Sequence, residues 1–337
     1  MLTEVHLKNF GPIQHLDWKN LGPINLIIGK NSAGKTFLLK ALYTAMRTLE
    51  TYQRGNEPRE LNEILTDKLY WTFQAEKIGD LVRKGGSEGL FLNLKSAEHL
   101  FHFAFGKDTS KHIQQASSSF PPRSANSVFL PAKEVLSLLK IILKSRDEDK
   151  IFGFDDTYVD LARALQSHPL RGKNYPGFSQ SRQGLEEILG GKLEFDERSS
   201  QWQFKQGNTK FPIGITAEGI KKIAILDTLL GNRYLTPNSL LFIDEPESAL
   251  HPQAISKFLE IIAQLAQSGI QVFMASHSYF VIKKLFLIAQ SENMSIPVIA
   301  AQEGGWQMEN LKNGLPENEI INESIQLYQQ EVALALQ

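Results

Sequence analysis

Short hydrophobic runs alternate with amphipathic segments along most of this chain, a pattern that predicts a sheet covered by helices. Four predominantly apolar runs are each long enough for one buried strand: 24–28, 127–130, 240–243 and 271–275. Segments with apolar residues at helical spacing separate or follow these runs, and the expected helices are 37–50, 135–144, 220–230 and 252–267. Because strands and helices alternate in the C-terminal half, we expect an α/β fold with a mostly parallel sheet.

The N-terminal part of the chain predicts a second, antiparallel β layer. Residues 3–10 alternate between polar and apolar, a Gly11-Pro12 turn follows, and 13–18 alternate again. Residues 90–95 and 100–105 have the pattern of a hairpin. These belong to a β-rich and loop-rich region at 51–125, in which 68–75 favour a strand or short helix and 106–126 a loop.

A mainly helical insertion is expected at 135–210, with hairpin strands at 193–195 and 202–204. The remaining expected elements are helices at 155–166, 182–189, 280–288 and 317–336 and a late strand at 296–300. No internal repeat divides the chain, so residues 1–337 are interpreted as one domain.

Composition restricts the function without specifying it. The 337 residues are 42% hydrophobic and 22% charged, as in ordinary globular proteins, and the net charge of −1 gives no global attraction to nucleic acid. The absence of cysteine excludes disulfides and thiolate zinc sites. The N-terminus has a strand pattern rather than that of a signal peptide, and no apolar stretch reaches the ~18 residues of a membrane span. We therefore expect a soluble, cytoplasmic protein with no membrane partner.

The segment between the strand at 24–28 and the helix at 37–50 fits the phosphate-binding pattern G-x-x-x-x-G-K-[ST]. Its glycines permit a loop of inward N–H groups, and the helix N-terminus favours an anion. Lysine supplies a positive charge for the phosphates, and the threonine hydroxyl is suited to Mg²⁺. A Gly-rich turn without function is disfavoured by the flanking strand and helix. The expected nucleotide-binding residues here are Gly29, Lys30, Asn31, Ser32, Ala33, Gly34, Lys35, Thr36 and Phe37.

Two more strands end in residues suited to nucleotide chemistry. Asp244 and Glu245 follow the apolar run 240–243, at the strand end where open α/β sheets bind ligands. We expect Asp244 to share Mg²⁺ with Thr36 and Glu245 to deprotonate or orient water. His277 follows the next strand and is expected to contact the terminal phosphate. Solvated acids and a structural loop histidine are the alternative interpretations.

A glycine-bearing helix start, Thr216 to Lys222, completes the motifs. In this order they resemble the ATPase head of the ABC superfamily, and more closely its SMC, RecF and OLD branch than transporters. The stretch Glu245-Pro246-Glu247-Ser248-Ala249-Leu250-His251-Pro252 is similar to that branch's E-P-E-x-x-L-H-P segment, whose D-loop falls at 248–251. The likeness implies a P-loop NTPase fold, with the signature motif at Thr216 to Gly219 and a Q-loop at Lys133 or Glu134.

The resemblance implies that ATP and Mg²⁺ are bound between two head-to-head copies. Glu218 and Gly219 of one copy would then face the ATP of the other, although Glu218 stands where many relatives have serine. Lys35, Glu245 and His277 would be catalytic. The chain has neither long coiled-coil arms nor room after His277 for a nuclease domain, so a separate nuclease is the expected effector. Stand-alone heads of this kind resemble the ATPase subunits of Septu-type or retron-associated anti-phage systems.

Two other functions remain open: a RecF-like DNA repair factor, and a transporter subunit, which the absence of L-S-G-G-Q disfavours. Contact with DNA or RNA is a further hypothesis. It is suggested by basic residues: Arg171, Lys173 and Arg182 in the insertion and Lys140 and Lys144 on one helix. Basic residues of this kind more often form a solvated face.

Overall fold

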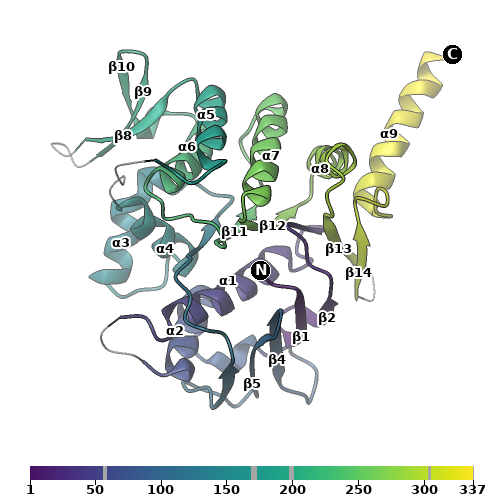
Figure 1. The fold of residues 1–337 in the computed structure, drawn as a ribbon. Helices are drawn as coiled ribbons and strands as arrows, with labels where there is room; N and C mark the ends of the chain where they lie inside the picture. The colour runs from purple at the N-terminus through teal and green to yellow at the C-terminus, as the bar shows by residue number, and fades with distance from the viewer. Residues whose placement is uncertain (56–58, 168–172, 197–200, 303–304, 337) are drawn as a thin grey trace.

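The structure, a computed structural model, describes residues 1–55, 59–167, 173–196, 201–302 and 305–336. Its centre is a six-stranded sheet in which only the edge strand β14 is antiparallel to its neighbour (Figure 1). In spatial order the strands are β14 (Gly305–Asn310), β13 (Pro297–Gln302), β3 (Ile24–Ile28), β12 (Gln271–Ser276), β11 (Leu240–Asp244) and β7 (Ser127–Leu130).

Both faces of the central sheet are covered, which explains why its inner strands β3, β12 and β11 are mostly apolar and fully buried. Leu241 and Ile243 of β11 pack into a core beneath helices on one face, whereas Leu240 and Phe242 pack into a second core around α1 on the other. The helices of the two faces are α1 (Lys35–Thr51), α7 (Pro252–Gln267) and α8 (Tyr279–Ser291).

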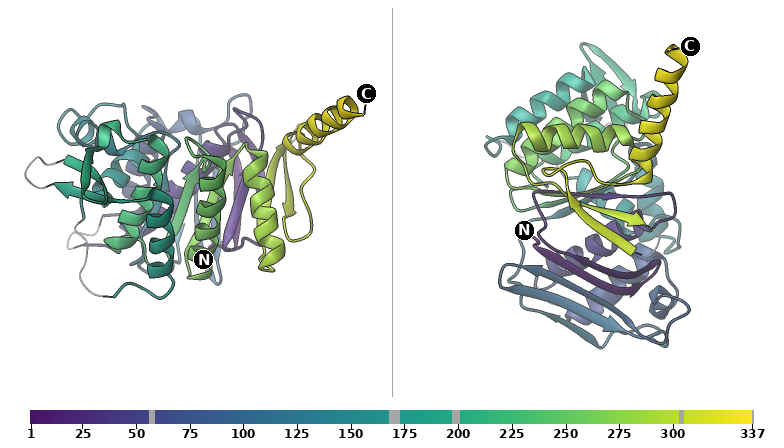
Figure 2. Two further views of the ribbon diagram at one scale, coloured as in Figure 1. Left: turned by 90° about the horizontal axis from the view of Figure 1, so that it is seen from above. Right: turned by 90° about the vertical axis from the view of Figure 1, so that its right-hand side faces the viewer.

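The second core lies between the central sheet and a five-stranded antiparallel sheet, with α1 enclosed between them (Figure 2). Helix α2 (Leu61–Phe73) and the 3-10 turn at Ile78–Leu81 close its side. The strands of this sheet, in spatial order, are β2 (Ile13–Trp18), β1 (Glu4–Phe10), β4 (Leu90–Ser96), β5 (His99–Phe105) and β6 (Gln115–Ser118).

A lobe of helices and a small sheet extends beyond β7 (Figure 1). Its sheet has the order β10–β9–β8, and 3-10 turns lie at Leu136–Leu138 and Ile213–Ile215. The elements of the lobe are α3 (Leu139–Asp147), α4 (Asp156–Leu165), α5 (Phe178–Leu189), β8 (Lys192–Asp196), β9 (Gln201–Gln206), β10 (Thr209–Pro212) and α6 (Glu218–Gly231).

Helix α9 (Glu319–Ala335) projects from the opposite end of the molecule (Figures 1 and 2). Among the described residues, no helix combines the length and the hydropathy required to cross a bilayer.

The α/β fold with a mostly parallel sheet and an antiparallel layer is confirmed, but several local expectations are wrong. The interval 106–126 contains β6, a polar edge strand that forms by pairing with β5. Of the two alternatives for 68–75, the helix is correct, because residues 68–73 form the end of α2. The helix expected from Val135 starts at Leu139, after a 3-10 turn. Strands β10 and β14, which were not expected, form because each pairs with its chain neighbour.

Phe242 tests the packing of the second core. Its side chain is fully buried, and its ring lies 5.3 Å from that of Phe273 and 6.5 Å from that of Phe129. Phe242→Ala should lower the free energy of unfolding by about 3–5 kcal/mol, because it leaves a cavity between packed rings. Urea denaturation measures this, with the exposed Leu287→Ala as the control. A loss as small as that of the control would contradict this core.

Candidate functional site

The expected site residues come together because three parallel strands lie side by side at the centre of the sheet. Strand β12 separates β3 from β11, and Asp244 of β11 is in register with Ala275 of β12, next to the Ser276–Ile28 pair. The carboxyl ends of the three strands therefore form one edge. The phosphate-loop segment, the acidic pair and His277 each leave the sheet at this edge.

The segment Gly29–Thr36 adopts a tight loop that ends at the N-terminus of α1. Gly34 is the N-cap with φ of +90°, and Ser32 also has a positive φ of +65°. A Cβ at Gly29 would lie 2.8 Å from the Cβ of Ala301, so both the conformation and the packing require glycine there. The loop therefore presents backbone N–H groups next to a helix N-terminus, as an anion site needs.

The Lys35 side chain lies inside this loop. Its Nζ donates hydrogen bonds to the carbonyls of Gly29 and Lys30, at 2.7 Å each, and the residue is only 8% exposed. Burial lowers the pKa of Lys35, while the carboxylates of Asp244 and its neighbours act in the opposite direction. A bound polyphosphate would supply negative charge that neutralises this buried ammonium group.

Thr36 and Asp244 are in direct contact although they are 208 positions apart in the sequence. The Thr36 hydroxyl lies 3.0 and 2.9 Å from the two carboxylate oxygens of Asp244. Burial raises the pKa of Asp244, and the hydrogen bond from Thr36 opposes that rise. A hydroxyl and a buried carboxylate are oxygen ligands of the kind that Mg²⁺ prefers, so these residues fit the metal that the sequence implies.

Glu245 and His277 face each other at the same edge. The Nδ1 of His277 lies 3.5 Å from Oε1 of Glu245, and both side chains are partly exposed. Glu245 has a φ of +48°, a left-handed conformation that costs free energy in a residue other than glycine. Its backbone N–H donates to Ala275 O at 2.9 Å, which holds this turn against β12. The carboxylate is thereby directed into solvent beside the imidazole.

Two residues of the site received no role from the sequence. Glu247 accepts a hydrogen bond from the Ser276 hydroxyl at 2.8 Å, and its Oε1 lies 3.8 Å from Nδ1 of His277. The buried Lys222 Nζ donates to the backbone carbonyls of Asp244 at 3.0 Å and Glu245 at 2.5 Å. Burial lowers the pKa of Lys222 to about 8, opposed by the nearby carboxylates. Both lie within quoted motifs, but sequence spacing could not reveal these contacts.

Glu218 and Gly219 lie at the N-terminus of α6. Glu218 is exposed, but Gly219 is buried against the segment 248–251 of the same chain. A Cβ on Gly219 would lie 2.4 Å from Ala249 O and 2.8 Å from Leu250 Cδ2. Glycine is therefore required here for close packing within the chain, independently of any phosphate.

The two Q-loop candidates, Lys133 and Glu134, and the loop residue Phe37 have different surroundings from the residues above. Glu134 accepts a hydrogen bond from the N–H of Ser137 at 2.8 Å and lies 3.8 Å from Lys221 Nζ, so it contacts α6, while Lys133 is exposed. The Phe37 ring packs 5.2 Å from that of Phe10, so the side chain belongs to the core rather than to the loop surface.

The basic residues considered for nucleic acid do not form one cluster. Arg182 donates to Asp227 at 2.7 Å, so its charge is partly neutralised. Lys140 and Lys144 are exposed on α3, and the carbonyl of Lys173 accepts from Arg233. Arg171 lies outside the described residues.

The chain matches the family model described as "AAA domain, putative AbiEii toxin, Type IV TA system" over residues 24–283, which is more than three quarters of its length. This range includes the phosphate loop, the acidic pair and His277.

Two curated relatives are similar to parts of the chain. The DNA replication and repair protein RecF of Bacillus mycoides is 34% identical over 28% of this chain and 23% of its own length. Old nuclease of Escherichia phage P2 is 51% identical over 12% of this chain and 7% of its own length. The chain thus spans less than two fifths of the curated relatives that it matches.

Among solved structures, an SMC head bound to the C-winged helix domain of ScpA is similar in fold. The TM-score is 0.54 at 12% identity, over 92% of this chain and 97% of that one. This likeness establishes the P-loop NTPase fold.

The buried Lys222 predicts a pH dependence of stability. Its pKa in the folded state, about 8, lies below the unfolded value, so the unfolded chain binds more protons between about pH 8 and 10.5. Stability contributed by this group should therefore rise with pH in that window, by at most about 1.4 kcal/mol per pH unit. Urea denaturation at pH 7.5, 8.5 and 9.5 measures the difference between wild type and Lys222→Met, which lacks this titration. A pH-independent difference would show that Lys222 titrates normally.

Proposed function

This chain belongs to the AAA-domain family whose model it matches, and we propose that it binds Mg-ATP and hydrolyses it to ADP and phosphate between two head-to-head copies. The observation that carries the proposal is the contact of Thr36 with Asp244, with Glu245 and His277 beside it. Few arrangements other than a nucleotide site need a phosphate loop, a buried carboxylate and a solvent-facing carboxylate at one sheet edge.

Each residue has a distinct role in the proposed reaction. Lys35 and the N–H groups of the loop bind the phosphates, and Thr36 and Asp244 hold Mg²⁺, which neutralises phosphate charge when bound. Glu245 accepts a proton from the attacking water, whose oxygen bonds to the γ-phosphorus as the bond to ADP breaks. His277 contacts the γ-phosphate and distinguishes ATP from ADP.

The second copy contributes the N-terminus of α6. Glu218 is exposed there, and the first N–H groups of the helix are suited to a phosphate of the partner's ATP. Gly219 allows this terminus to pack on residues 248–251, close to the catalytic strand end. ATP would then hold the two copies together, and hydrolysis would release them, which makes the protein a two-state switch.

The finer proposal is that this switch controls a separate effector, a nuclease of an anti-phage defence system. The similarity to Old nuclease supports a link with nucleic-acid cleavage. The residues after His277 form α8, β13, β14 and α9, of which β13 and β14 extend the central sheet. ATP-dependent co-purification with the product of a neighbouring nuclease gene tests this.

The similarity to RecF favours one alternative, an ATP-dependent DNA clamp without an effector. DNA binding by the purified chain separates the two. ATP-dependent retention of DNA by the chain alone supports the clamp, whereas retention that requires the neighbouring gene product supports the effector switch.

Glu245→Gln tests the catalytic assignment. The amide keeps the size of the side chain but cannot accept the proton, so turnover should fall by about 100-fold or more. ATP affinity should be retained, and the ATP-bound dimer should accumulate. Phosphate release and light scattering with Mg-ATP measure these effects, with Glu98→Gln on an exposed turn as the matched control. Normal turnover by the Glu245 variant would refute the role.

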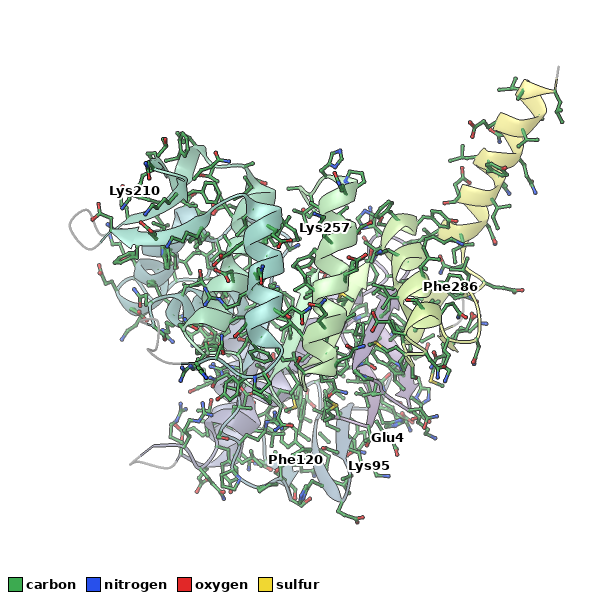
Figure 3. All side chains as sticks on the ribbon, turned by 45° about the horizontal axis from the view of Figure 1, so that its top comes forward. Glu4, Lys95, Phe120, Lys210, Lys257 and Phe286 are labelled. Atoms are coloured by element: carbon green, nitrogen blue, oxygen red, sulfur yellow. The ribbon has the colours of Figure 1, made fainter. Side chains whose placement is uncertain are left out.

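Lys35→Met tests the phosphate site separately. Removing the buried ammonium should weaken ATP binding by about tenfold or more, because a charge-assisted bond to phosphate is lost. Isothermal titration calorimetry measures the affinity. The control is Lys257→Met, which changes an exposed lysine of α7 (Figure 3). Equal ATP affinities in the two variants would contradict a phosphate-binding Lys35.

A further inference from the structure

The outer turns of α9 expose an unusual amount of apolar surface. Every residue from 325 to 336 is exposed, and their side chains extend into solvent around the helix (Figure 3). Short isolated helices are marginal in water, and most helical stability comes from packing. We therefore expect this part of α9 to be covered in the functional assembly. The large apolar residues, which are 39–83% exposed, are Ile325, Leu327, Tyr328, Val332, Leu334 and Leu336.

The apolar residues of α9 lie on two sides of the helix. Ile325, Tyr328 and Val332 follow helical spacing and form one stripe. Leu327 and Leu334, seven residues apart, form a second stripe about 200° from Ile325 at 100° per residue. A helix with two apolar sides fits a groove that contacts it from both, whereas a single seam would suit a two-stranded coiled coil.

The lobe contains such a groove. A cavity of about 1120 Å³ opens between α3 with its preceding 3-10 turn and the β8–β9 hairpin, and α6 lines it as well. Apolar side chains from the helix side and from the hairpin side line it: Leu136, Leu139, Leu143, Leu193, Phe195 and Trp202.

The α9 helix of the same chain cannot occupy this groove. α9 follows β14 at one edge of the six-stranded sheet, whereas α3 follows β7 at the other edge. The helix points away from the lobe (Figures 1 and 2). Five interstrand spacings separate the edges by roughly 24 Å, so the occupant must come from another molecule.

We propose that α9 of one copy seats in the lobe groove of the second copy, and reciprocally, in the ATP-bound dimer. The inference rests on the proposed function, because a head-to-head dimer places each phosphate loop opposite the partner's α6. α9 begins at that loop, where Glu319 Oε1 lies 2.8 Å from Lys30 Nζ. The partner's groove is lined by Pro212, Ile213 and Gly214, which come shortly before the N-terminus of α6. The start of α9 and this end of the groove therefore lie near the same nucleotide.

The charges of α9 and of the α3 side of the groove are complementary. α9 has three glutamates and no lysine or arginine, and Glu323 and Glu331 flank the Leu327–Leu334 stripe. On the groove side, Lys140 and Lys144 lie one turn apart on α3, beside Leu139 and Leu143, and neither forms an ion pair with a described residue. The Leu327–Leu334 stripe therefore faces α3, and the Ile325–Tyr328–Val332 stripe faces the hairpin.

Disulfide cross-linking tests this contact directly, because the natural chain contains no cysteine. Val332→Cys and Gln201→Cys, the latter an exposed groove position on β9 of the hairpin, are introduced into separate full-length Glu245→Gln chains, which are mixed with Mg-ATP and oxidised. The mixed dimer, in which a Val332→Cys chain is cross-linked to a Gln201→Cys chain, should form in at least tenfold excess over a control product. In that control, Leu287→Cys replaces Val332→Cys, because Leu287 is an exposed apolar position on α8.

Two results would overturn the proposal: a mixed product no stronger than the control, or cross-links only between two Val332→Cys chains. Light scattering on the same samples separates this failure from that of the proposed function. An ATP-dependent dimer without the mixed cross-link refutes the seating of α9 and leaves the proposed function intact. Absence of any ATP-dependent dimer refutes both.

A substitution on α9 provides an independent measurement. Tyr328→Glu places a charge in the groove and should raise the Kd of the Glu245→Gln dimer at least tenfold, with ATP affinity unchanged. Leu287→Glu, the matched control, should leave the Kd unchanged. Equal Kd values for the two variants would overturn the proposal.

Discussion

The structure depends on the side-by-side packing of three parallel strands, β3, β12 and β11. Their register brings the Thr36 hydroxyl to within 2.9 Å of the Asp244 carboxylate across a separation of 208 residues. Hydrophobic burial on both faces fixes that register, because a slip of one residue would exchange the two cores on either side of the sheet. The core beneath the site thus fixes its position. The loops of the site start at the ends of these strands, and packing prevents the strands from moving independently.

Three buried charged residues lie at this edge. Lys35, Lys222 and Asp244 are each at most 8% exposed, and the two ammonium groups donate to backbone carbonyls rather than forming close ion pairs. Burial lowers the pKa of both lysines and raises that of Asp244, so the site without nucleotide is electrostatically costly. The left-handed backbone of Glu245 adds to this cost.

Lys222 links two parts of the proposed site. It belongs to α6, whose N-terminus is proposed to face a partner's nucleotide, and its Nζ donates to the carbonyls of Asp244 and Glu245, which are proposed to act on this chain's own nucleotide. Gly219 brings the same helix against the segment 248–251. A shift of α6 on dimer formation would therefore reach Glu245 through a short, packed path. The apolar α9 and the lobe groove lie at opposite ends of the head, so each copy offers both halves of a reciprocal contact.

The sequence by itself determined the α/β fold and the phosphate loop. It also determined that the phosphate loop, Asp244 and His277 lie at the same edge of the sheet. These follow from short-range patterns: the apolar period, glycines at special backbone conformations, and acids directly after a buried run. Only the tertiary structure identified Lys222 and Glu247 as parts of the site, gave Gly219 its packing role, and placed Glu134 against α6. Strands β6, β10 and β14 likewise exist because a neighbouring strand pairs with them. Nor could the pattern of 317–336 reveal that α9 lies away from the head. Whether a residue is buried, and which residues it contacts, depends on its surroundings, and those surroundings come from segments that are distant in the sequence.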